Sequence, residues 1–83
     1  MANDAVRKAQ LKKLKELEAE AEKNYDDLYE THSDYDATVC YSGAKEALYD
    51  AISLANRLGL NEEAERLYKR LEHIKAVFRS QFS

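Results

Sequence analysis

The chain carries three residues of the types that bind soft metals or act as a nucleophile with its base: His32, Cys40 and His73. Zinc sites place cysteine and histidine at short fixed spacings, such as CxxC or HxxxH, because neighbouring ligands must reach one ion. No such spacing joins these three residues. A Cys40–His32 pair also lacks a third group that would orient the base. The spacing therefore predicts no metal site, and we expect Cys40 to be a small core residue.

The segment from Asp34 to Lys45 begins like a calcium-binding loop, with carboxylates at its first and third positions. Such a loop also needs glycine at its sixth position, for a sharp turn, and a carboxylate at its twelfth. Those positions hold Val39 and Lys45, so the loop fails at two essential points. Because no acid–base pair stands out either, we expect no cofactor and no enzymatic activity.

The remaining candidate site is a tyrosine-rich acidic segment. Four of the six tyrosines lie between positions 25 and 41, and positions 16 to 36 hold nine acidic residues and one lysine. Tyrosine is enriched at protein interfaces because it offers a large apolar ring with one polar end. Alternatively, the rings pack on the edge of the core and the carboxylates form a solvated helix face. The predicted partner-binding surface comprises Tyr25, Asp26, Asp27, Tyr29, Tyr35 and Tyr41.

Helix-forming residues dominate the 83-residue chain, which has no proline and only two glycines. An all-β chain uses Gly and Pro in its many turns, whereas Ala, Leu, Glu, Lys and Arg favour helices. The composition therefore predicts a single all-α domain.

The net charge of −3 argues against general nucleic-acid binding, which requires an excess of Lys and Arg on the contact face. No apolar run approaches the ~20 residues that span a bilayer. The first residues lack the basic-then-apolar pattern of a secretory signal. A single cysteine cannot form an internal disulfide, which is typical of a reducing compartment. We therefore expect a cytoplasmic protein without nucleic-acid or membrane partners.

Apolar residues recur at steps of three and four in three segments, which is the pattern of amphipathic helices. We expect the first helix from about residue 4 to about residue 31. The third is expected from about residue 62 to about residue 81, with Asn61 as its N-terminal cap. Their apolar stripes are Leu14, Leu17, Ala21, Tyr25 and Leu28 in the first helix, and Ala64, Leu67, Leu71, Ile74 and Phe78 in the third.

The second helix is expected to end at residue 58, because Gly59 is the usual left-handed residue after a helix. Its start has two alternatives. Ser33 and Asp36 form a capping pair for a helix over 34–58, whereas Ser42 caps a shorter helix over 43–58. An in-phase small-residue stripe favours the longer helix, and poor helix formers between 38 and 43 favour the shorter one. The stripe is Ala37, Cys40, Ala44, Ala47, Ala51, Ala55 and Leu58.

Charges are segregated along the first helix, basic before acidic, against the preference of the helix dipole. The third helix has the opposite order. In an up-down-up three-helix bundle these two helices run parallel, so basic residues lie beside acidic ones. Two copies of the first helix packed antiparallel match charges as well, and its first two turns are expected to project. The basic block of the first helix is Arg7, Lys8, Lys12, Lys13 and Lys15.

The segment around Gly59, Ala64 and Tyr68 resembles the turn and second helix of a tetratricopeptide repeat. The resemblance covers about thirty residues, and no second copy follows. The preceding helix has Ile52 where the repeat has glycine, and the third has Leu71 where it has alanine. The resemblance implies a helical hairpin and favours protein binding.

The sequence thus favours a small adaptor or regulator that binds another protein through the tyrosine-rich acidic surface. The alternative is a structural subunit or homo-oligomer that assembles through the first helix.

Overall fold

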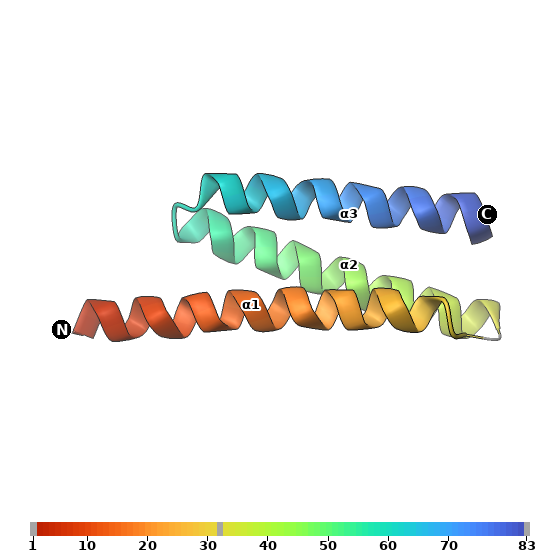
Figure 1. The fold of residues 1–83 in the computed structure, drawn as a ribbon, viewed down its shortest axis with the longest axis horizontal. Coiled ribbons are helices and arrows are strands. Elements are labelled where there is room, and N and C mark those ends of the chain that lie inside the picture. The colour runs from red at the N-terminus through yellow and green to blue at the C-terminus, as the bar shows by residue number, and fades with distance from the viewer. Residues whose placement is uncertain (1, 32, 83) are drawn as a thin grey trace.

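The computed structural model describes the backbone of residues 2–31 and 33–82 and the side chains of residues 4–31 and 33–81. Three helices follow one another: α1 (Ala2–Leu28), α2 (Asp34–Arg57) and α3 (Asn61–Phe82). Helix α2 packs against both α1 and α3, which run in the same direction (Figure 1). No strand occurs in the described backbone. The structure confirms the predicted all-α, up-down-up three-helix bundle.

The core consists of the apolar stripes of the three helices. Five alanines of α2 are buried, and their small side chains let a middle helix approach its neighbours closely. Tyr25 and Tyr41 are half-buried and pack on the core edge, and Cys40 is also half-buried. The fully buried larger side chains are Leu28, Leu48, Leu67, Leu71 and Ile74.

Local hydrogen bonds explain both ends of α2. The Ser33 hydroxyl accepts a bond from the Asp36 backbone N–H at 3.1 Å, so the helix begins at Asp34 and has the longer of the two alternative starts. At the other end Gly59 adopts a φ of 74°. The N–H of Leu60 then donates to the carbonyl of Ala55 at 2.9 Å, which closes the C-terminal turn.

Helix α1 ends at Leu28, three residues earlier than expected. The last turn tightens, because the N–H of Tyr29 donates to the carbonyl of Asp26 at 3.2 Å. The Thr31 hydroxyl then donates to the carbonyl of Leu28 at 3.0 Å and caps the helix. No basic side chain lies in this last turn, so nothing local offsets the negative end of the helix dipole.

Helix α3 begins at Asn61 itself. The first helical bond runs from the N–H of Ala64 to the carbonyl of Leu60 at 2.9 Å. Leu60 therefore occupies the capping position that the sequence assigned to Asn61. Within the described residues, none of the three helices is long and apolar enough to cross a lipid bilayer.

Candidate interaction surface

Two ion pairs join α1 to α3. The guanidinium of Arg66 donates to both carboxylate oxygens of Glu18, from Nη1 at 2.7 Å and from Nη2 at 2.9 Å. Nη2 also donates to Glu63 on its own helix at 2.8 Å. The hydrogen bonds from Arg66 lower the pKa of Glu18 below its ordinary value of 4.5. Two-point geometry of this kind fixes direction as well as distance.

The second pair repeats this arrangement one turn later. Arg70 donates to Glu22 from Nε at 2.9 Å and from Nη2 at 2.6 Å. Its guanidinium carbon also lies 4.8 Å from the centre of the Tyr25 ring, within the range of a cation–π contact. The hydrogen bond to Glu22 raises the pKa of Arg70. The third helix thereby holds the middle of α1 through two arginines.

The two pairs fix the register of α1 against α3. Both join residues 48 positions apart, which sets Asn61 level with Lys13. The turns of α1 before Lys13 therefore extend roughly 16 Å beyond the start of α3, at 1.5 Å per residue. Figure 1 shows this end of α1 extending past the turn between α2 and α3. Every described side chain from Asp4 to Ala9 is exposed.

Tyr25 and Tyr29 form a pair near the C-terminal end of α1. Their hydroxyls are hydrogen-bonded at 2.7 Å, and their rings meet edge to face with centres 5.3 Å apart. The hydrogen bond to Tyr29 raises the pKa of Tyr25. Tyr29 is 54% exposed, so the pair presents one open ring at the C-terminal end of α1.

The other two tyrosines of the predicted surface lie on α2. Tyr41 stacks on Phe78 of α3, with ring centres 3.9 Å apart, and the ammonium of Lys45 lies 4.4 Å from its ring centre. Its ring is thus engaged within the α2–α3 interface. Tyr35, in the first turn of α2, is 77% exposed. The structure therefore brings Tyr25 and Tyr29 into contact and stacks Tyr41 on Phe78.

The sequence interpretation missed the cation–π contacts of two tyrosines on α2, Tyr41 and Tyr49. Tyr49 lies under the ammonium of Lys75, which is 5.5 Å from its ring centre. Tyr68 on α3 is 54% exposed. A usable signal was present, because Lys45 stands four residues after Tyr41, the spacing at which helical side chains meet. The partner of Tyr49 comes from another helix and was not readable from local spacing.

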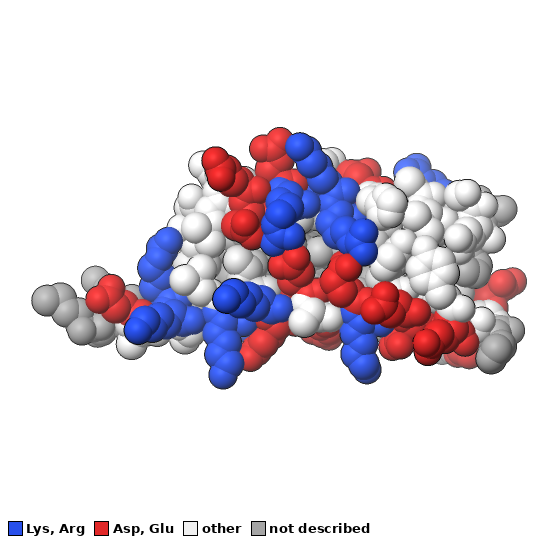
Figure 2. All heavy atoms as spheres, in the orientation of Figure 1, with Lys and Arg blue, Asp and Glu red and all other residues white. Residues whose placement is uncertain are grey.

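Many charges of α1 form no ion pair within the described chain. The described ion pairs involve only Glu18 and Glu22 among its acidic residues, and none of its basic residues. Figure 2 shows the result: basic atoms gather towards the N-terminal half of α1 and acidic atoms towards its C-terminal half. An uncharged area lies beside the acidic end, over the C-terminal half of α3.

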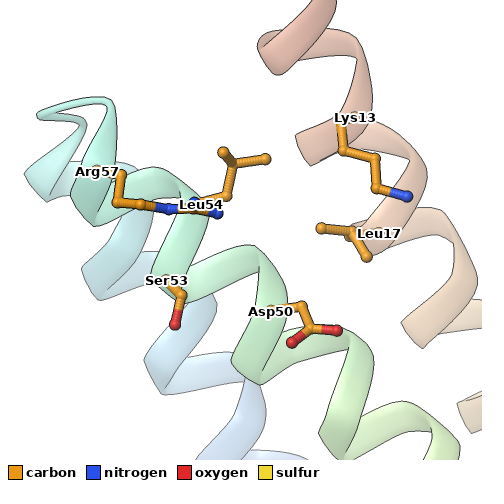
Figure 3. Close-up of a pocket in the computed structure, with 6 residues that line it drawn as sticks. All are labelled: Lys13, Leu17, Asp50, Ser53, Leu54 and Arg57. Carbon is orange, nitrogen blue, oxygen red and sulfur yellow. The ribbon is translucent and has the colours of Figure 1, made fainter.

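A small pocket of about 290 Å³ lies between α1 and α2 (Figure 3). Leu17 and Leu54 form its apolar part and belong to the core. Its volume is at the lower limit of pockets that enclose small ligands. A hollow of about 410 Å³ lies over the α1–α3 ion pairs, where the charged groups already pair with one another. The polar residues around the smaller pocket are Lys13, Asp50, Ser53 and Arg57.

Among the described residues, no three His, Cys, Asp or Glu side chains are arranged to hold a metal ion. His32, one of the three candidates from the sequence, lies outside the described residues. Comparison of the chain with protein-family models, with curated proteins and with solved structures finds no match.

Proposed function

We propose that this protein is a small helical interaction module, an adaptor or regulator, that binds a basic partner protein through the C-terminal end of α1. The observation that carries the proposal is the Tyr25–Tyr29 pair, which lies at the same end of α1 as Asp26 and Asp27, two acidic residues without an ion pair among the described residues. We define the tyrosine surface as this pair, the two acidic residues between its members and the exposed tyrosine of α2. It comprises Tyr25, Asp26, Asp27, Tyr29 and Tyr35.

The electrostatics of α1 supports a basic partner. Asp26 and Asp27 lie in the last turn of the helix, where the dipole disfavours carboxylates. Local arrangements that oppose stability are expected at functional sites. A cationic side chain of a partner at this end relieves the conflict, and the open Tyr29 ring supplies apolar contact area.

The proposal needs no cofactor and no reacting group. The single cysteine, Cys40, is a free thiol on α2, which is compatible with work in a reducing compartment such as the cytoplasm. An adaptor of this kind brings its partner to a third molecule, and a regulator of this kind blocks such a contact.

The test is quantitative capture by the tagged protein from a lysate of its native organism. We expect a stoichiometric partner for the wild type, lost at high salt because the contact is electrostatic. The variant Tyr29→Ser/Tyr35→Ser is expected to lose this partner while its helical circular dichroism is unchanged. Tyr68→Ser is the matched control, since Tyr68 on α3 is as exposed as Tyr29 at 54%. Equal capture by the double variant and the wild type contradicts the assignment.

A second candidate function is a homo-oligomer that assembles through α1. The observation in its favour is the set of exposed charges on α1, on the side that faces neither α2 nor α3.

A further inference from the structure

One face of α1 points away from the rest of the bundle. The buried residues of α1 are Leu14, Leu17, Ala21 and Leu28, and its pairs to α3 leave from Glu18 and Glu22. Residues on the opposite side recur at steps of three and four, so they form one continuous stripe. All of them are exposed. This α1 outer face consists of Lys8, Lys12, Glu16, Ala19, Lys23, Asp26 and Glu30, the last of these in the turn after the helix.

The charged groups of the α1 outer face form no ion pair among the described residues. Helix α3 behaves differently, because four of its basic side chains, Arg66, Lys69, Arg70 and Lys75, pair with carboxylates. The described ion pairs therefore form between α1 and α3 and within α3, whereas none involves the α1 outer face.

The signs along this face have a particular symmetry. In chain order they are positive, positive, negative, neutral, positive, negative, negative. Reversing the order and exchanging the signs returns the same series. A second copy that runs antiparallel therefore sets Lys8 opposite Glu30 of the partner subunit, and Lys12 opposite the partner's Asp26. In this alignment Glu16 lies within one residue of the position opposite the partner's Lys23.

We propose that two copies of this chain pair antiparallel along the α1 outer face, with Ala19 at the two-fold axis. This inference specifies the second candidate function above, and the α1 outer face shares only Asp26 with the tyrosine surface. Ala19 suits the axis, because a small side chain at the crossing point lets two helices approach to about 8 Å. A two-fold interface of this kind closes on itself and stops at a dimer.

Other orientations of the second copy match the charges of the α1 outer face less well. A parallel pair sets lysine against lysine at one end and carboxylate against carboxylate at the other. The antiparallel pair also places the basic half of one helix beside the acidic, dipole-negative end of the other, which resolves the unfavourable charge order of α1. Exposed ion pairs are individually weak and are screened by salt. The dimer is consequently weak and salt-dependent.

The test combines two charge-reversal variants in sedimentation equilibrium. Lys8→Glu/Lys12→Glu makes both ends of the face acidic, and Asp26→Lys/Glu30→Lys makes both ends basic. Each variant alone is expected to dimerise more than about tenfold more weakly than the wild type. An equimolar mixture restores dimers, because every acidic end then meets a basic one. Restoration in the mixture assigns the contact to opposite charges on the α1 outer face.

The control is Arg57→Glu/Lys69→Glu, which changes the net charge as much as Lys8→Glu/Lys12→Glu but on α2 and α3. The wild type is compared at about 0.01 M and 1 M salt, where the Debye length is about 30 Å and 3 Å. A monomeric wild type at the lower salt, an equal loss in the control, or a mixture that stays monomeric overturns the proposal.

The Lys8→Glu/Lys12→Glu variant leaves the tyrosine surface unaltered. Its capture of a partner from lysate therefore tests the proposed function separately from the dimer.

Discussion

The contact between Gly43 of α2 and Asn24 of α1 allows a sharp test of how these two helices pack. Gly43 lies in the middle of α2, and its φ is not positive. Backbone conformation therefore does not require glycine there. A Cβ at this position lies 3.0 Å from Cγ and Oδ1 of Asn24 and 3.1 Å from its Nδ2. The amide of Asn24 is itself held, because Nδ2 donates to the carbonyl of Glu20 at 3.0 Å.

Two effects compete in Gly43→Ala. Replacing glycine inside a helix favours folding by about 1 kcal/mol, and overpacking a close contact costs about 1–3 kcal/mol. We expect a net loss of stability between about 0 and 2 kcal/mol in the wild-type background. With Asn24→Ala the obstacle is gone, and Gly43→Ala is expected to stabilise by about 1 kcal/mol.

The assay is urea unfolding of the four proteins of this cycle, followed by circular dichroism at high salt so that pairing of α1 is screened. The expected coupling free energy between the two positions is about 1–3 kcal/mol. If Gly43→Ala stabilises both backgrounds equally, the two residues are not in contact, and the packing of α1 on α2 described above is wrong.

Three further predictions concern stability. Gly59→Ala should destabilise by about 1–2 kcal/mol in urea unfolding, because its φ of 74° disfavours a Cβ although no atom lies within 4 Å. An effect near zero contradicts the left-handed turn. Leu48→Ala should cost about 2–5 kcal/mol, since the side chain is fully buried, and a cost below about 1 kcal/mol contradicts its place in the core. Arg66 lowers the pKa of Glu18 in the folded chain, so the unfolded state binds the proton more readily. The stability that this group contributes is present above its ordinary pKa of 4.5, and it is lost as the pH falls through the lowered folded value. Glu18→Gln should flatten this part of the pH profile, and an unchanged acid slope contradicts the pair.

Features set by nearest neighbours were predictable from the sequence. The apolar steps gave the three helices, Gly59 marked the turn between α2 and α3, and Ser33 with Asp36 offered the start that α2 has. The opposite charge orders of the first and third helices indicated that acidic and basic residues meet there. The structure has that contact on the acidic half of α1, through Glu18 and Glu22, whereas the basic half of α1 forms no ion pair with α3 among the described residues.

Contacts that depend on the axial register between two packed helices were not predictable from the sequence. The sequence offers several acidic residues in the second half of α1, and only the register of the bundle selects the two that meet arginines. The same holds for Tyr41, whose place beside Phe78 depends on how α2 and α3 align. The C-terminal end of α1 was predicted at about residue 31, beyond its actual end at Leu28. The tightening of the last turn and the Thr31 cap give only a weak signal in the sequence.

Pairing of α1 is tested most directly by cysteine cross-linking at the two-fold axis. In a Cys40→Ala background, Ala19→Cys places two thiols against each other, whereas Ala9→Cys places them roughly 30 Å apart, at 1.5 Å per residue on an antiparallel pair. Both positions are exposed on α1. We predict that mild oxidation at low salt gives a disulfide dimer from Ala19→Cys and leaves Ala9→Cys monomeric. Equal cross-linking at both positions, or none at position 19, contradicts the antiparallel dimer.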